Sequence, residues 1–405
     1  MVSAIGCGVR LPVTCALYYD AKRPPQEGGH YKKMMSEAAK MASLAEGEAQ
    51  RQSDTAADSG FLWDFWYPAL RSEEIRGKKL ATAMLLEVPL VLGRASDGRA
   101  FAMRDSCPHR GIPLSYGRFD GKTLECSYHG WRFDACTGQC VEIPSLTSQD
   151  KLKVDRIFAG HYPCEEHDGY VWVYMTAPGG RAPEEIDPAP ELRKFGARYK
   201  STRLFCDLPS HVDHGIIGLM DPAHGPFVHQ SWFWRSRGSI HEKEKKFEPI
   251  PNGFRMSPHS PSTNSAPYQL LKKMTGAPVT TTIDFVLPNM RLEEIRSGKL
   301  WFSSRATVTP VRRDLCRIDF VAAWNVPLPV FVFRMFAKTF LRQDQETMIQ
   351  QSEGLKHNPR LMLIDDADRP AKWYFALKAN LIEERRTGQA KPHPLDGPVT
   401  LHWKS

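Results

Sequence analysis

The sequence has no run of eighteen apolar residues, so it predicts no transmembrane span. It also has no G-x-G-x-x-G motif and no flavin-binding signature, so we do not expect the chain to take electrons from NADH by itself. No basic run is interleaved with aromatic residues, and a net charge of +8 over 405 residues is modest. The sequence therefore indicates no nucleic-acid partner, although it leaves room for an acidic protein partner.

Cysteines are few and irregularly spaced. There are nine of them, an odd number, scattered between Cys7 and Cys316. This pattern is not a disulfide framework, and it favours a reducing, cytoplasmic compartment. Cys136 and Cys140 flank T-G-Q, but no second pair of possible metal ligands lies near them, so we interpret them as incidental.

Two short segments share an unusual combination of residues. Residues 107–111 read C-P-H-R-G and residues 126–131 read C-S-Y-H-G-W. One cysteine and one histidine from each segment suit a cluster with one iron held by sulfur and the other by nitrogen, which is a Rieske [2Fe–2S] centre. The alternative is a structural zinc site, but zinc motifs usually pair Cys with Cys and His with His. The four candidate ligands are Cys107, His109, Cys126 and His129.

The rest of the chain divides into three parts. Residues 1–60 predict a poorly ordered extension that ends in a polar linker. Residues 61–178 contain short strand-like runs and both cysteine–histidine segments, which predicts an all-β domain. A Pro/Gly-rich linker follows, and residues 190–405 predict a second domain with an antiparallel sheet and a helix at about 331–356. The predicted fold class is α+β.

A second group of possible ligands lies at residues 218–229, which read G-L-M-D-P-A-H-G-P-F-V-H. His224 and His229 would lie about 140° apart on a regular helix, but Pro226 breaks the helix between them and allows both rings to face one point. Asp221 is three residues before His224 and is expected to share its helix face. Two histidines and a distant carboxylate form the facial triad of non-haem Fe(II) oxygenases.

The expected helix at 331–356 supplies a candidate third ligand. Asp344 lies on the same face as Phe340 and Met348, and a carboxylate on a core-facing stripe needs a partner. That partner is a metal ion in our interpretation, with an ion pair to a buried arginine as the alternative. Asp365 and Asp366 are the fallback ligands.

Together these motifs resemble the terminal oxygenase (alpha) component of Rieske non-haem iron oxygenases, over about residues 61–356. The branch containing pheophorbide a oxygenase and vanillate demethylases is the most similar. The resemblance implies a helix-grip catalytic domain, a mononuclear Fe(II) held by His224, His229 and Asp344, and a connecting role for Asp221 between the two metal centres. The other interpretation of Asp221 is a helix N-cap before Pro222. Many family members have asparagine where this chain has Gly218.

The function implied by the resemblance is oxygenation of a small molecule with O2. Electrons would come from a separate NAD(P)H-dependent reductase, directly or through a ferredoxin, to a head-to-tail homotrimer. The reaction would be a hydroxylation, demethylation or dihydroxylation, and the branch favours monooxygenation. An apolar, aromatic substrate is expected because Phe227 lies within the iron motif and residues 232–234 (W-F-W) follow it.

Two alternatives to an oxygenase remain. The first is a Rieske electron-transfer protein that keeps the fold without oxygenase activity, and the three mononuclear ligands argue against it. The second is a respiratory Rieske subunit. Those proteins carry an additional cysteine in each cluster loop, and neither loop of this chain has one.

Overall fold

The computed structural model describes residues 60–405 except 230–237, 239 and 261–265. The predicted extension at 1–60 therefore lies almost wholly outside the described residues, and so do the aromatic residues 232–234. Residues Ala56–Ser405 form one compact unit. Among the helices of the described part of the chain, none is long and apolar enough to cross a membrane.

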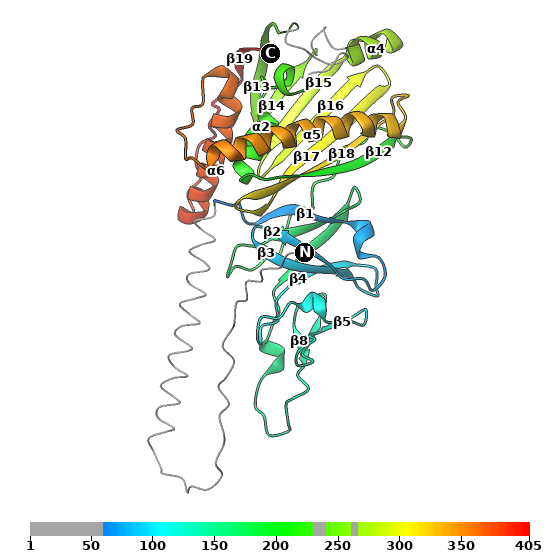
Figure 1. Cartoon of the computed structure of the whole chain (residues 1–405), viewed down its shortest axis with the longest axis vertical. Helices are drawn as coiled ribbons and strands as arrows, with labels where there is room; N and C mark the ends of the chain where they lie inside the picture. The colour runs from blue at the N-terminus through cyan, green and yellow to red at the C-terminus, as the bar shows by residue number, and fades with distance from the viewer. Residues whose placement is uncertain (1–59, 230–237, 239, 261–265) are drawn as a thin grey trace, which may run out of the picture. The chain divides into compact units, whose positions relative to one another are not determined.

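Three small antiparallel sheets form the first part of this unit (Figure 1). Their strands are short, as the closely spaced turn residues of the sequence predict. The first sheet has the order β1 (Phe65–Arg71), β11 (Tyr170–Met175), β10 (Cys164–His167). The second has the order β2 (Ala81–Leu85), β3 (Val88–Arg94), β4 (Ala100–Arg104), β9 (His161–Tyr162). The third has the order β5 (Arg118–Phe119), β6 (Thr123–Glu125), β7 (Arg132–Asp134), β8 (Cys140–Glu142), and 3₁₀ turns occur at Ser72–Ile75, Leu114–Tyr116 and Val154–Arg156.

The second part is an eight-stranded antiparallel sheet with helices. The strand order is β12 (Lys200–Leu208), β18 (Leu315–Trp324), β17 (Leu300–Arg312), β16 (Met290–Ser297), β15 (Thr280–Val286), β14 (Gly253–His259), β13 (Glu242–Ile250), β19 (Val399–Lys404). The helices are α2 (Val212–Met220), α3 (Gly225–Val228), α4 (Ala266–Thr275), α5 (Val330–Leu355) and α6 (Arg369–Thr387), with a 3₁₀ turn at Asp366–Asp368. The predicted α+β fold class is confirmed, and α5 agrees closely with the helix expected at 331–356.

Helix α5 lies across one face of the large sheet (Figure 1). It starts after Pro329, whose fixed φ suits the residue before a helix. Near this end Phe333 packs on Trp324, with ring centroids 4.5 Å apart. Further along, the Cys206 thiol of β12 lies 3.7 Å from the Leu341 carbonyl oxygen. The first contact holds the start of α5 against the sheet, and the second lies three residues before Asp344.

Strand β11 joins the two parts. The sequence predicts an alternating strand, but all six of its residues are buried. Val171 and Val173 belong to a large apolar core that also contains Val308 of the eight-stranded sheet. Trp172 and its neighbours on the other face pack with Trp301 of that sheet. Both faces of the strand are therefore covered.

The hairpin turn between β2 and β3 also contacts the large sheet. Leu86 and Glu87 both have positive φ, at 52° and 64°. This conformation is unfavourable for residues other than glycine. Their backbone N–H groups donate to the carbonyl oxygens of Pro310 and Val311, which offsets the strain and fixes the turn on β17.

Candidate metal centres

The two cysteine–histidine segments form loops with the same backbone hydrogen bonds. In the first loop Cys107 N–H donates to Ile112 O, and Gly111 N–H donates to Cys107 O. In the second loop Cys126 N–H donates to the residue five positions on, and Gly130 N–H returns to Cys126 O. Both glycines have positive φ, +73° and +69°, which explains their presence at these positions.

The donor atoms of these loops suit a two-metal cluster better than a single ion. The rings of His109 and His129 lie 4.6 Å apart at the protein surface, while Cys107 and Cys126 are buried beneath them. Within the described residues, the three-ligand group whose donor atoms all lie within 4.8 Å is a different one, so these four donors do not surround one point. A single zinc ion would need them to do so.

A buried cysteine thiol and an unpaired histidine nitrogen also indicate a ligand between the two loops. Burial, with a smaller contribution from the adjacent Cys126, raises the pKa of the Cys107 thiol to about 11. A thiol with a raised pKa becomes a thiolate at neutral pH only when a metal supplies positive charge. Nδ1 of His129 is buried and has no hydrogen-bond partner among the described residues. The residues present therefore fit a [2Fe–2S] cluster.

The other candidate ligands come from α5 and from the segment between α2 and α3. Helix α2 ends at Met220, Asp221 follows as its C-cap, and His224 is the N-cap of the short α3. The expectation that Asp221 and His224 share a helix face is therefore wrong, because no helix includes both. Asp221 is also not an N-cap: its Oδ1 accepts a hydrogen bond from Ala223 N–H at 2.6 Å, within the turn that joins the helices.

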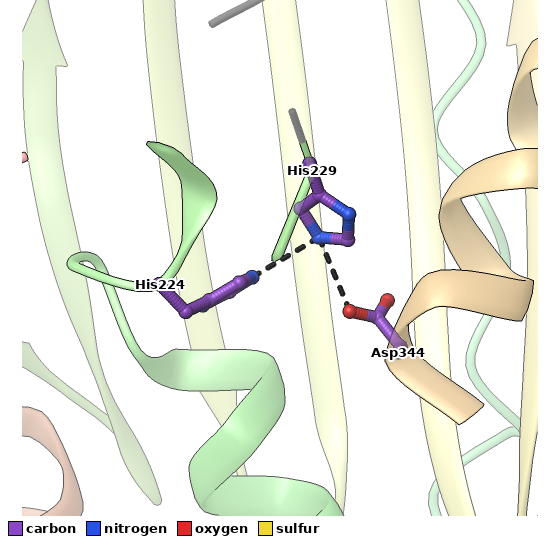
Figure 2. Close-up of side chains that lie close together, drawn as sticks. All are labelled: His224, His229 and Asp344. Atoms are coloured by element: carbon purple, nitrogen blue, oxygen red, sulfur yellow. Dashed lines mark hydrogen bonds and ion pairs between the residues drawn. The ribbon is translucent and has the colours of Figure 1, made fainter. Parts of the chain in front are cut away.

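His224, His229 and Asp344 meet at one point (Figure 2). The two histidine Nε2 atoms are 3.1 Å apart, and His229 Nε2 is 3.1 Å from Asp344 Oδ1. Ligand atoms about 2.1 Å from one metal ion and at right angles to each other lie about 3 Å apart. The side chains of His229 and Asp344 are 10% and 32% exposed, so the group is partly open. The arrangement suits a metal ion with free positions for other ligands.

Each imidazole has a different partner on its second nitrogen. Asp221 Oδ2 lies 3.6 Å from His224 Nδ1, which is longer than a good hydrogen bond. Burial lowers the pKa of His224, but the carboxylates of Asp221 and Asp344 together outweigh burial, and the net shift is upward. The amide oxygen of Gln343 lies 3.2 Å from His229 Nδ1. Gln343 belongs to no motif in the sequence, and its position next to Asp344 is the one signal that points to it.

The surroundings of this site are partly as expected. The Phe340 ring packs on His229 with ring centroids 4.7 Å apart, and Met348 is buried. A Cβ atom at Gly218 would lie 3.7 Å from Met348, an ordinary contact, so a Cβ at this position would not displace Met348. Phe227 is 51% exposed. The fallback residues Asp365 and Asp366 do not join the group: Asp365 pairs with Lys372, and Asp366 accepts from His402 N–H.

Residues 65–155 match the model of the Rieske [2Fe-2S] domain. This part of the chain is a Rieske domain. The chain is 33% identical to chlorophyllide a oxygenase, chloroplastic, of Arabidopsis thaliana over 43% of this chain and 30% of that protein. It is 34% identical to the 3-chlorobenzoate-3,4-dioxygenase oxygenase subunit of Comamonas testosteroni over 42% of this chain and 38% of that one. It is 33% identical to the dicamba O-demethylase oxygenase component of Stenotrophomonas maltophilia, over 42% of this chain and 48% of that protein.

The fold is shared with solved structures of two proteins. NdmA of Pseudomonas putida CBB5, as a QL mutant with theobromine, has a TM-score of 0.64 at 18% identity, covering 83% of this chain and 96% of that one. Dicamba monooxygenase bound to dicamba has a TM-score of 0.62 at 20% identity, covering 81% and 99%. The predicted order of a Rieske domain followed by a catalytic sheet is confirmed as a fold.

The matches to curated relatives are partial. The aligned region spans between 25% and 48% of the length of the relatives named chlorophyllide a oxygenase or dicamba O-demethylase. The predicted relationship to Rieske oxygenases is confirmed, since the Rieske domain is matched and these relatives are named as oxygenases or demethylases.

Proposed function

We propose that this protein is the terminal oxygenase of a multicomponent Rieske system. The single observation that carries the proposal is the meeting of His224, His229 and Asp344 in a chain that also has a Rieske domain. A Rieske protein that only transfers electrons has no use for a second, partly open metal site. When bound, the [2Fe–2S] cluster supplies single electrons, and Fe(II) at the second site activates O2.

In this proposal each ligand residue has a separate task. Cys107 and Cys126, which are buried, would hold one iron of the cluster, and His109 and His129, which lie at the surface, would hold the other. At the second site the Gln343 amide oxygen accepts the Nδ1–H of His229, which leaves Nε2 free to bind metal. The Asp221 carboxylate lies 3.6 Å from His224 Nδ1, beyond hydrogen-bond distance, so it acts on this ring through its charge.

The partners are part of the proposal as well. A separate NAD(P)H-dependent reductase, directly or through a ferredoxin, delivers electrons to the exposed His109–His129 edge. A head-to-tail homotrimer brings that edge to the catalytic site of the next subunit, with Asp221 between the two centres. The compartment is a reducing one, either cytoplasm or plastid stroma, and matched relatives from plants and an alga are named as chloroplastic.

The proposed reaction is monooxygenation or demethylation of a small molecule with an apolar, aromatic body. The apolar neighbours of the metal site, Phe340 and Met348, favour such a body. Two matched relatives are named for a chlorobenzoate and for dicamba, and one structural neighbour is described with theobromine. Dihydroxylation remains an outcome of the test.

Product analysis tests this function. The full chain is reconstituted with iron and sulfide, mixed with a surrogate ferredoxin and reductase, and supplied with ¹⁸O2 and aromatic acids, ethers and N-methyl heterocycles. An oxygenase incorporates one or two ¹⁸O atoms into a product or releases formaldehyde. If the cluster is reduced and reoxidised with no product from any substrate and with iron bound at His224, His229 and Asp344, the protein is an electron carrier.

A further inference from the structure

Two charged residues lie on the face of the large sheet that the metal-bearing helix covers. In an antiparallel sheet, directly paired residues point to the same face. One such row runs across the sheet from Phe254 through Phe285, Arg291, Ala306 and Phe320 to Leu204. At one end of the row Phe254 packs on Trp373 of α6, and at the other Phe320 packs on Phe333 of α5. Arg291 therefore points to the side of the sheet where α5 and α6 lie.

Glu293 is in the next row on the same face. This row runs through Met256, Ile283, Glu293, Ser304, Ala322 and Thr202. Thr202 accepts a hydrogen bond from Arg334 of α5. Glu293 Oε2 lies 3.0 Å from Arg291 Nη1, and the two side chains are 17% and 22% exposed. The pair is therefore mostly buried, but part of each side chain is still exposed to solvent.

Such a pair is out of place among these neighbours if its role is structural. The residues paired with Arg291 are Phe285 and Ala306, and neither can form a hydrogen bond through its side chain. The free energy needed to remove two charges from water exceeds the attraction between them unless further hydrogen bonds satisfy both groups. Arginine has five donors, and within the described residues only Nη1 meets a carboxylate.

The same face has other polar groups and an excess of positive charge. Along β13 to β16 its cations are Lys243, Lys245 and Arg291, against the single carboxylate of Glu293. Lys243 is occupied by the hydroxyl of Ser405. Thr281, 3% exposed, has a hydroxyl without a partner among the described residues. A buried hydroxyl of this kind needs a water or a ligand atom.

We propose that Arg291 binds an anionic oxygen group of the substrate, so that the substrate is an organic acid with an apolar body. Glu293 holds the guanidinium in position through Nη1 and leaves its other donors for the acid. A planar fork of donors suits a carboxylate. This inference rests on the proposed oxygenase function, whose substrate it narrows to acids.

Binding of matched acid and amide probes tests the proposal without turnover. The probes are benzoate and 2-naphthoate against benzamide and 2-naphthamide, titrated calorimetrically into the iron-loaded full chain without electrons or O2. The acids should bind about 10- to 100-fold more tightly than the amides, as a charge-assisted hydrogen bond allows. Equal affinity for acids and amides, or no binding of either acid, overturns the proposal.

A matched pair of variants assigns the effect to Arg291. Arg255 pairs with Asp284 at 2.6 Å on the opposite face of the same sheet, so Arg255→Gln is the control. Arg291→Gln should abolish the preference for acids, while Arg255→Gln keeps it. The double variant with Glu293→Gln retains a polar pair and serves if the single variant fails to fold. An unchanged preference in Arg291→Gln contradicts the assignment.

The outcomes separate this inference from the proposed function. If acids bind through Arg291 but no acid is oxygenated, the site stands and the oxygenase proposal fails. If neutral ethers or heterocycles are oxygenated, and Arg291→Gln oxygenates them as fast as the unmodified protein, the oxygenase proposal stands and the proposed acid site is wrong.

Discussion

Gln343 Oε1 lies 3.2 Å from His229 Nδ1, on the opposite side of the ring from the nitrogen that faces Asp344. Two consecutive residues of α5 therefore contact the same imidazole from both sides. In the proposed site the Gln343 contact would set the tautomer of the ring, and Asp344 would bind the same metal ion as His229.

Gln343→Leu should weaken Fe(II) binding about 10- to 100-fold, because partners of metal-bound histidines typically contribute that much. Titration of the apo protein with Fe(II) measures this effect, and the Rieske EPR signal should not change. Gln345→Leu is the control, since Gln345 donates to Asp207 O and does not touch the histidines. Equal iron affinity in both variants would remove Gln343 from the site.

Substitutions of the two carboxylates near the second metal site should have different effects. Asp344→Ala removes a direct ligand, so mononuclear iron should be lost while the cluster persists. Asp221→Asn keeps the hydrogen bond to Ala223 N–H, so both metals should stay, yet cluster reoxidation with substrate and O2 should slow strongly. Iron per chain, cluster EPR and reoxidation rates decide the matter. Loss of iron in Asp221→Asn with retention in Asp344→Ala would reverse the two roles.

The reconstituted protein should be brown and show a Rieske-type EPR signal after reduction. His129→Cys should lower the reduction potential, because a thiolate adds negative charge to the cluster. Cys136→Ser is the control and should leave the potential unchanged, since Cys136 is outside the two loops. Stoichiometric zinc without acid-labile sulfide would contradict the assignment of the cluster.

Arg305 and Asp168 form a buried pair, 2.8 Å apart with both side chains 2% exposed. Asp168→Ala leaves the guanidinium buried without its carboxylate, so it should cost roughly 3–5 kcal/mol of unfolding free energy. Asp314→Ala, which breaks the exposed pair with Arg312, should cost only about 0–1 kcal/mol. Urea denaturation of both variants gives the comparison, and similar losses would disprove the role of burial.

Asp319 should make stability depend on pH. Burial raises the pKa of its carboxyl to about 7, despite the opposing effect of Arg317, whereas an unfolded chain has a pKa near 3.9. Between these values the folded state holds a proton that the unfolded state has released, so stability falls as pH rises from about 4 to about 7. The loss is roughly 1.4 kcal/mol for each unit of pKa difference. Asp319→Asn should remove this part of the pH profile measured by denaturation.

The sequence was sufficient where chemistry is local. The pairs Cys107–His109 and Cys126–His129 identify a Rieske centre because a cluster dictates both residue type and loop length. Asp344 could be predicted as a candidate ligand because a helix repeats every 3.6 residues, and this repeat places Asp344 on an apolar face.

Other features depend on contacts between distant segments. The two partly buried charges at 291 and 293 look like ordinary strand surface in the sequence, and only the register of neighbouring strands places them on the helix-covered face. The turn at Leu86 and Glu87 has no glycine, so its left-handed backbone is visible only together with β17. Asp221 was expected to share a helix face with His224 because the helix was assumed to continue through Pro222. The helix instead ends at Met220.

Strand β11 has a consequence for anyone who wants to exchange modules between related oxygenases. Its aromatic face is buried with Trp301, Val321 and Ala323 of the catalytic sheet, and its aliphatic face shares a core with Val308. A Rieske module cut out after Met175 would carry that aromatic face into water as an aggregation-prone patch. Chimeras should therefore be designed to transplant the facing residues of β17 and β18 together with β11, and the two halves of the chain should melt in a single transition.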